Sequence, residues 1–323
     1  MGPEPKGLTP GYSLGLRHIS PNSAGNPNDH RGHRRFIPQP LDSLASLGRR
    51  VRVQRIGEWE AMSRGFALIT GASSGIGAAF ARKLARMGHG VILVARRRDR
   101  LETLAGELGK QFGVDTEVVV ADLANPTDLE TVEQLVRQHP NLEYLVNNAG
   151  FGTGGRFPKV ALTRNLDMLR VHCEAAVRLC HAAIPGMIAA KHGAIINVSS
   201  VAGLLRVPGS AMYCSTKTFL NAFSESLSME LRNTGVKVQA LCPGFTYTEF
   251  HDTPDLADTF NRSDIPSFLW LSADRVVDMS FRGLKRNQVI CVTGLRYKAL
   301  IAILRIPWMR PLIRRASRRR QQG

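Results

Sequence analysis

Tyr213 and Lys217 stand four residues apart in a segment whose apolar pattern predicts a helix over Ser210–Asn233. Side chains at this spacing lie on one face of a helix, one turn from each other. A tyrosine with a pKa near ~10 is a poor acid–base group at neutral pH, and a neighbouring ammonium lowers that pKa by favouring the phenolate. The pair indicates general acid–base chemistry. The spacing alone also fits an ordinary surface pair.

A glycine-rich segment, Thr70-Gly71-Ala72-Ser73-Ser74-Gly75-Ile76-Gly77, follows an expected strand and opens an expected helix. Its glycines allow a tight turn, close approach of a pyrophosphate to backbone N–H groups, and close packing of helix on strand. In this setting the segment predicts a dinucleotide site. The residues that we expect to contact the cofactor here are Gly71, Ser73, Ser74, Gly75, Ile76 and Gly77.

Arginines, and no acidic residue, follow the second expected strand, which continues Ala95-Arg96-Arg97-Arg98. Sites that prefer NAD usually have a carboxylate here for the ribose hydroxyls, whereas a guanidinium suits a 2′-phosphate through charge-assisted hydrogen bonds. We therefore predict a preference for NADP(H) over NAD(H), with Arg96 as the ligand. The alternative, which we favour for Arg98, is that the arginines only begin a solvated helix.

Short apolar runs alternate with segments of 3.6-residue period from Phe66 onward. This alternation predicts an α/β fold, a Rossmann-like doubly wound parallel sheet of seven strands in a single domain over residues 62–295. The expected strands are Phe66–Thr70, Val91–Ala95, Glu117–Val120, Tyr144–Asn147, Ala194–Val198, Val236–Leu241 and Gln288–Val292. The expected helices are Gly75–Met87, Asp99–Gln111, Pro126–Gln138, Arg164–Lys191, Ser210–Asn233 and Ala273–Arg286.

The order of these motifs resembles the short-chain dehydrogenase/reductase superfamily across nearly all of residues 62–295. The resemblance rests on Thr70–Gly77, Asp122-Leu123, Asn147-Asn148-Ala149-Gly150, Ser199-Ser200, Tyr213 with Lys217, and Pro243-Gly244 followed by Thr248. It implies hydride transfer between NADP(H) and a carbonyl/alcohol pair. Tyr213 would protonate the substrate oxygen, Ser200 would donate a hydrogen bond to it, and Lys217 would tune Tyr213 and hold the nicotinamide ribose.

The resemblance also implies further contacts and one departure. Asp122 and Leu123 would lie near the adenine, Asn148 and Pro243 along the cofactor, and Thr248 at the carboxamide. Many members carry an asparagine where this chain has His172, and that asparagine holds a water in the proton relay. A neutral imidazole can hold such a water, and a packed histidine without a catalytic role is the alternative.

Apolar side chains are frequent in residues 249–272, the part that closes over the substrate in the family. This content favours an apolar ketone, aldehyde, acyl or ring substrate, or else the same side chains cover the domain's own core. The resemblance further implies a homodimer or homotetramer. A protein of this fold that senses the cofactor without turnover is the alternative function. The apolar members are Phe250, Leu256, Phe260, Ile265, Phe268, Leu269 and Trp270.

The net charge of +17 is concentrated at the C-terminal end of the chain. Residues 1–61 carry +4, residues 62–278 carry +1, and residues 279–323 carry 12 Lys/Arg with no acidic residue. A nearly neutral body speaks against nucleic-acid binding as the main task. Residues 296–323 mix Leu, Ile and Trp with arginines, and their apolar stretch is too short to span a bilayer. This composition fits contact with a membrane surface, a docked helix or a solvated basic tail.

Residues 1–61 show no sustained period and are expected to be disordered. We favour Met62 as the true start, with an arginine-rich organellar transit peptide as the alternative. Five cysteines without metal-ligand spacing indicate a reducing compartment and predict no metal site. We therefore expect a cytoplasmic protein that binds a small-molecule substrate, either free or peripheral to a membrane.

Overall fold

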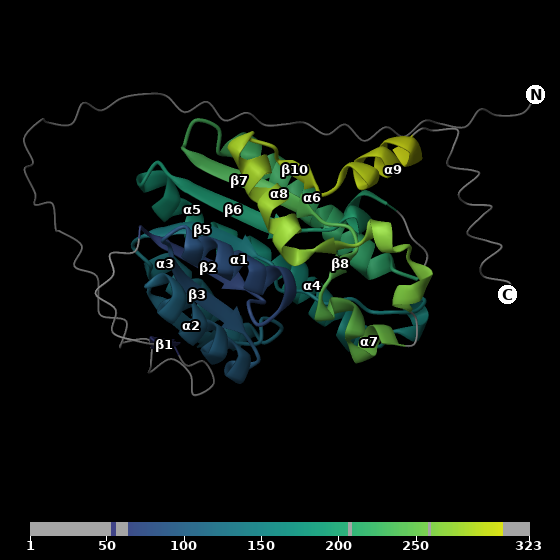
Figure 1. The fold of residues 1–323 in the computed structure, drawn as a ribbon, viewed down its shortest axis with the longest axis horizontal. Helices are drawn as coiled ribbons and strands as arrows, with labels where there is room; N and C mark the ends of the chain where they lie inside the picture. The colour runs from purple at the N-terminus through teal and green to yellow at the C-terminus, as the bar shows by residue number, and fades with distance from the viewer. Residues whose placement is uncertain (1–52, 56–63, 206–208, 258–259, 306–323) are drawn as a thin grey trace, which may run out of the picture. The chain divides into compact units, whose positions relative to one another are not determined.

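The computed structural model describes residues 53–55, 64–205, 209–257 and 260–305, and Figure 1 shows a central sheet between two layers of helices. The strands are β1 (Val53–Arg55), β2 (Phe66–Thr70), β3 (Gly90–Ala95), β4 (Thr116–Val120), β5 (Leu142–Asn147), β6 (Gly193–Val198), β7 (Val236–Cys242), β8 (Thr246–Tyr247), β9 (Leu271–Ser272) and β10 (Ile290–Val292). The helices are α1 (Gly75–Arg86), α2 (Arg98–Phe112), α3 (Pro126–Gln138), α4 (Leu162–Leu169), α5 (Ala175–Ala189), α6 (Ala211–Glu230), α7 (Pro254–Ala257), α8 (Ala273–Lys285) and α9 (Leu295–Arg305).

The sheet has the strand order β1-β4-β3-β2-β5-β6-β7-β10, and all of its neighbours from β4 to β10 are parallel. β2 pairs with β3 on one side and with β5 on the other, so the direction of winding reverses between β2 and β5. In open α/β sheets the ligand crevice lies outside the carboxyl ends of the strands at such a reversal. The predicted doubly wound parallel sheet is confirmed.

One strand of this sheet was not predicted. β1 pairs antiparallel with β4, with Val53 opposite Val119 and Arg55 opposite Glu117, and makes the sheet eight-stranded where seven strands were expected. It lies inside the segment 1–61, for which we expected no regular structure. Three residues are too few to show the alternation of apolar and polar side chains that predicts a strand. β1 forms because the edge of β4 supplies its hydrogen-bonding partners, which the local sequence does not reveal.

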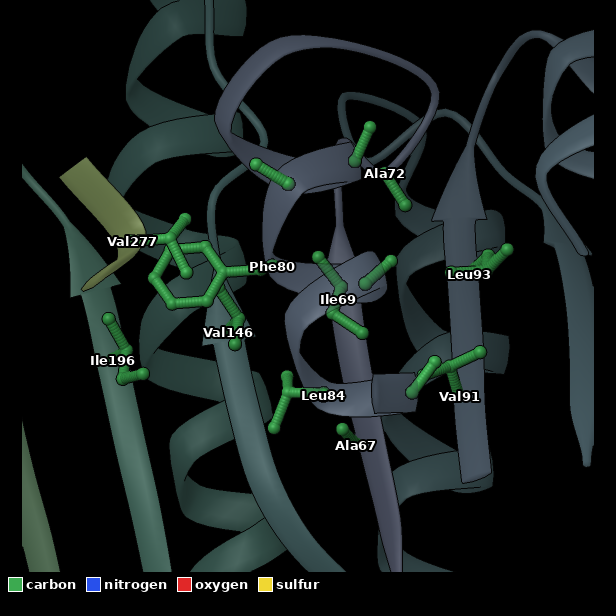
Figure 2. Close-up of a cluster of buried hydrophobic side chains, with 14 of the residues drawn as sticks. Ala67, Ile69, Ala72, Phe80, Leu84, Val91, Leu93, Val146, Ile196 and Val277 are labelled. Carbon is green, nitrogen blue, oxygen red and sulfur yellow. The ribbon is translucent and has the colours of Figure 1, made fainter. Parts of the chain in front are cut away.

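Each face of the sheet has its own apolar core. Helices α1, α2 and α8 cover one face, and α3, α5 and α6 cover the other. Figure 2 shows Phe80 and Leu84 of α1 pressed against Ile69 of β2 and Val146 of β5. Because β2, β3 and β6 are buried on both faces, their sequences are mostly apolar, as is usual for parallel sheets.

The long helix expected over Arg164–Lys191 is interrupted. It consists of α4, a π-helical turn at Arg170–Glu174, and α5. A π-helical turn widens the helix locally without changing its course, so the apolar period of the sequence carries no sign of it. The turn contains His172, whose side chain is buried. The other predicted helices and strands begin and end within two residues of their predicted bounds, except that α6 ends at Glu230, three residues before the predicted Asn233.

Candidate active site

A cavity of about 1240 Å³ follows the carboxyl ends of the parallel strands. The loops after β2, β3, β4, β5, β6 and β7 all contribute to its wall. Every residue that the sequence analysis assigned to the site lines this cavity except Gly77 and His172. The lining members of that set are Gly71, Ser73, Ser74, Gly75, Ile76, Arg96, Asp122, Leu123, Asn148, Ser200, Tyr213, Lys217, Pro243 and Thr248.

The glycine-rich loop has the shape that a dinucleotide requires. Gly71 and Gly75 have positive φ angles of 66° and 57°, a conformation that is strained for residues with a side chain. Helix α1 begins at Gly75, with its N-terminus at the cavity. A Cβ on Gly77 would stand 2.3 Å from the carbonyl oxygen of Gly71. Gly77 therefore acts behind the cavity wall, where it lets α1 pack on the loop. The residues present fit a bound pyrophosphate.

Thr70 joins the loops that follow β2 and β5. Its hydroxyl oxygen accepts the backbone N–H groups of Asn148 and Ala149, each across 2.9 Å. The side-chain amide of Asn148 in turn donates to the Thr70 carbonyl oxygen across 2.9 Å. These bonds cross the reversal between β2 and β5 and hold the two cofactor loops in one arrangement. Asn148 thus braces the loop after β5 against the loop after β2.

Ser200, Tyr213 and Lys217 meet at the middle of the cavity. Tyr213 lies in the first turn of α6, is hydrogen-bonded to the Ser200 side chain, and lies with its ring centroid 5.7 Å from the Lys217 Nζ. Lys217 donates from Nζ to the Val198 carbonyl oxygen across 2.9 Å. Ser199 instead donates its hydroxyl to the carbonyl oxygen of Lys217, 2.8 Å away. Ser200 is therefore the serine that faces the tyrosine.

Burial dominates the protonation of this group. It raises the pKa of Tyr213 to about 12 against the opposing effect of the hydrogen bond from Ser200, and it lowers the pKa of Lys217 to about 8. The predicted lowering of the Tyr213 pKa by Lys217 is therefore wrong for this structure. The ammonium points to Val198, and the cost of a buried phenolate is the larger effect. Tyr213 holds its proton at neutral pH.

His172 is buried behind the cavity with both ring nitrogens engaged. Nε2 lies 3.1 Å from the backbone N–H of Phe151, and Nδ1 lies 2.9 Å from the Thr216 hydroxyl. Burial, reinforced by the charge of Lys217, lowers the pKa of His172 well below its usual value. No nitrogen is left for the relay water that the sequence analysis assigned. The contacts give His172 a positioning role in place of a catalytic one.

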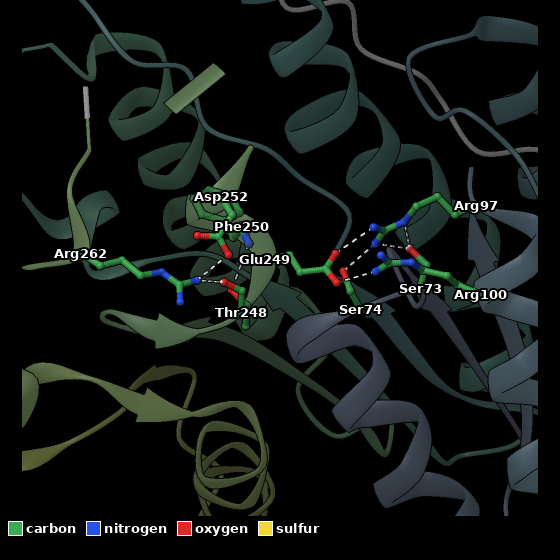
Figure 3. A network of polar contacts seen from close by, with 9 residues as sticks. All are labelled: Ser73, Ser74, Arg97, Arg100, Thr248, Glu249, Phe250, Asp252 and Arg262. Carbon is green, nitrogen blue, oxygen red and sulfur yellow. Dashed lines mark hydrogen bonds and ion pairs between the residues drawn. The ribbon is translucent and has the colours of Figure 1, made fainter. Parts of the chain in front are cut away.

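The arginines after β3 divide in a way that the sequence did not reveal. Arg96 lies 3.8 Å from the Asp122 carboxylate with its side chain 72% exposed. Figure 3 shows Arg97 directed at the glycine-rich loop, where its guanidinium donates to the hydroxyls of Ser73 (3.0 Å) and Ser74 (2.8 Å). Arg97 therefore contacts the glycine-rich loop, whereas Arg96 lies beside Asp122, and its place in the triplet of arginines was the only sequence signal for Arg97.

Glu249 ties the loop after β8 to these arginines. Its carboxylate accepts from Arg97 across 2.8 Å and from Arg100 across 2.5 Å, and these bonds hold the pKa of Glu249 below its usual value. Thr248 packs its methyl group where a Cβ on Gly75 would lie. The two residues bring the start of the substrate loop against the cofactor half of the cavity (Figure 3).

The half of the cavity beside residues 249–272, which is the expected substrate half, is lined by apolar side chains and by the polar side chains of His251, Asp252, Asn261 and Asp264. Phe250, Leu256, Phe260 and Ile265 line it, and the Phe250 ring lies 5.9 Å from the ring of Tyr213. Trp270 is buried among the aromatic rings behind this wall, and Phe268 points outward. Some apolar residues of this loop therefore face the cavity, whereas Trp270 covers the domain's own core.

A model of the short chain dehydrogenase family matches residues 65–256. The chain is 32% identical over 190 residues to the very-long-chain 3-oxoacyl-CoA reductase of Anas platyrhynchos, covering 57% of this chain and 60% of that protein. It is 30% identical over 215 residues to the inactive hydroxysteroid dehydrogenase-like protein 1 of Homo sapiens, covering 66% and 61%. The chain thus spans about three fifths of the length of these relatives.

Among solved structures, the chain resembles a short-chain dehydrogenase from Sphingobium yanoikuyae in complex with NADPH. The TM-score is 0.68 at 34% identity, with 74% of this chain and 93% of that chain covered. It also resembles the bulky-bulky ketone specific alcohol dehydrogenase of Comamonas testosteroni, with a TM-score of 0.64 at 29% identity and coverage of 77% and 94%.

Proposed function

The chain belongs to the short-chain dehydrogenase family, and from that premise we propose that it is an NADPH-dependent reductase of a carbonyl group on an apolar substrate. The observation that carries the proposal is the meeting of Ser200, Tyr213 and Lys217 in the cavity that the glycine-rich loop opens. The apolar wall of Phe250, Leu256 and other loop residues supports the substrate class.

The chain's own groups supply the acid chemistry of the reaction. Ser200 binds the carbonyl oxygen and places it against Tyr213, whose phenol gives its proton to that oxygen as the carbon is reduced to the alcohol. The Tyr213 phenol carries its proton at neutral pH, which is the form that the reductive direction requires. Lys217 holds the ribose. When bound, the nicotinamide supplies the hydride.

NADPH is the cofactor that the charge of the site supports best. Arg96 and Arg97 stand at the cavity where β3 ends, and no acidic residue follows this strand as a ribose ligand. The NADPH bound to the Sphingobium yanoikuyae relative is consistent with this preference.

A 3-oxoacyl thioester is the substrate that we place first. The 3-oxoacyl-CoA reductase relative acts on such a chain, and the cavity wall beside Tyr213 offers aromatic and aliphatic surface for an acyl tail. An apolar ring ketone is the second candidate, because it suits the same wall and because a ketone-specific dehydrogenase is similar in structure.

We also propose that the chain forms a homodimer or homotetramer. Large apolar side chains are exposed on α4 and α6, where burial against a second copy would remove them from water. Those exposed side chains are Leu162, Leu166, Leu169, Phe219 and Met229.

A protein that binds the cofactor without turnover is the alternative, and the similarity to an inactive relative of this family supports it. NADPH oxidation with 3-oxoacyl thioesters, long-chain aldehydes and ring ketones distinguishes the two. We expect turnover by the wild type, and a loss of about 10²- to 10⁴-fold in Tyr213→Phe with NADPH binding retained. Binding of NADPH without turnover of any substrate by the wild type would favour the sensor.

A further inference from the structure

Helix α9 is fastened to the body by one side only. Tyr297 and Ile301, one turn apart, are buried. The Tyr297 hydroxyl donates to the Leu269 carbonyl oxygen across 2.8 Å and accepts the backbone N–H of Phe245 across 2.9 Å. Its ring occupies the space where a Cβ on Gly244 would lie. The helix is thus fixed against the loop that follows β7, at the periphery of the fold (Figure 1).

The outward side of α9 is apolar, which is unusual for a helix that faces water. Leu295 is 82% exposed and Ile303 is 47% exposed, and with the exposed Ala299 they form a stripe at every fourth residue. Arg296 and Lys298 are exposed on either side of this stripe. Exposed apolar residues with a cation on each side are typical of a helix that lies in a lipid interface.

A neighbouring aromatic side chain extends the stripe. Phe268 is 57% exposed, and the Arg296 guanidinium lies 5.0 Å from its ring centroid and donates to its carbonyl oxygen across 2.6 Å. We call Leu295, Ala299, Ile303 and Phe268 the α9 face. Arg296, held beside Phe268 at the edge of the α9 face, can contact acidic headgroups. The apolar side chains of the face can enter the acyl region of the bilayer.

We propose that the α9 face binds the surface of a membrane that contains anionic lipid. Residues 279–323 carry 12 Lys/Arg and no acidic residue, so the end of the chain that holds this face is strongly positive. A second copy of the chain on the same face would oppose these like charges, whereas acidic headgroups neutralise them. A nucleic acid would match the charge and leave Leu295 and Ile303 in water.

Helix α9 has 11 residues, too few to cross a bilayer, so the proposed contact is with the bilayer surface. Within the described part of the chain, no helix is long and apolar enough to cross a membrane. Tyr297 connects α9 to Phe245, which lines the cavity, so docking brings the substrate half of the cavity near the lipid.

Cosedimentation of the full chain with vesicles tests the proposal directly. We compare vesicles of phosphatidylcholine alone with vesicles that also contain phosphatidylglycerol, at low and at high salt. The wild type is expected to bind the mixed vesicles, with weaker binding to neutral vesicles and at high salt. Leu295→Ser and Ile303→Ser are each expected to weaken binding by about tenfold.

Ile188→Ser is the matched control, because Ile188 is 40% exposed on α5, outside the α9 face. Its binding should equal that of the wild type, and the midpoint of thermal unfolding should be the same for all variants. The proposal would be overturned if Leu295→Ser and Ile303→Ser bound the mixed vesicles as the wild type does. It would also be overturned if the wild type did not bind them. A dimer that dissociates in these variants would also overturn it and make the face a self-interface. None of these results depends on turnover.

Discussion

Phe151 donates its backbone N–H to Nε2 of His172 across 3.1 Å, and this bond fixes the tautomer of the imidazole. Since Nε2 accepts, the single ring proton of the neutral form is on Nδ1, 2.9 Å from the Thr216 hydroxyl oxygen. Thr216 directly precedes Lys217 on α6. His172 therefore couples the cofactor loop after β5 to the helix that carries the catalytic pair, and it does so through the π-helical turn that directs its side chain inward.

Replacement of His172 by Asn should cost stability and leave the pH dependence of the reaction unchanged in shape. The shorter side chain cannot satisfy both Phe151 and Thr216, and a buried polar group without a partner costs about 1–3 kcal/mol in the free energy of unfolding. Urea unfolding measures this loss. A plot of kcat/KM against pH for the variant tests the role, since disappearance of an acidic limb would show that the imidazole relays protons.

The same variant should be less sensitive to acid. Burial lowers the pKa of His172 far below 6.5, so below about pH 6.5 the unfolded chain binds a proton that the folded chain refuses. Stability from this residue is complete above that pH and falls by about 1.4 kcal/mol per pH unit below it. Urea unfolding between about pH 7 and about pH 5 should give a shallower slope for His172→Asn. Equal slopes would mean that His172 is charged in the folded protein.

The sequence predicted those features of the site that depend on position along the chain. Each motif follows a strand, and parallel strands end at one edge of the sheet, so Ser200, Tyr213 and the glycine-rich loop had to meet there. It could not show which arginine contacts the glycine-rich loop, because this depends on the backbone angles of Arg97 at the start of α2. Nor could it give the pKa of Tyr213, which depends on how deeply the assembled fold buries the phenol.

Lys217 should impose an alkaline limb on the reaction. Its pKa of about 8 means that the free protein loses this positive charge as the pH rises through that value, so kcat/KM for NADPH should fall about tenfold per pH unit above it. Lys217→Arg keeps its charge throughout this range, and its profile should lack the limb even where the rate is lower. A limb at the same pH in Lys217→Arg would assign the titration to another group.

Arg97→Ala should weaken the use of NADPH more than that of NADH. Its guanidinium donates to the hydroxyls of Ser73 and Ser74 beside the expected 2′-phosphate, and loss of a charge-assisted bond corresponds to about 10- to 100-fold in kcat/KM. The rate with NADH should change by less than about threefold. Arg96→Ala is the matched comparison. The larger effect there would restore the original assignment, and an unchanged cofactor ratio in both variants would contradict the NADP preference.

Gly77→Ala should show how tightly α1 must pack on the cofactor loop. The added Cβ would stand 2.3 Å from the Gly71 carbonyl oxygen, a backbone atom that can move only if the loop opens. We expect a loss of about 1–3 kcal/mol in the free energy of unfolding, together with weaker NADPH binding.

Gly106→Ala in α2 is the control, because nothing lies within 4 Å of its added Cβ. That variant should gain about 0.5–1 kcal/mol from its helical backbone and bind NADPH as the wild type does. Equal behaviour of the two variants in urea unfolding and in fluorescence titration with NADPH would show that the loop yields, and that Gly77 serves only as a helix residue.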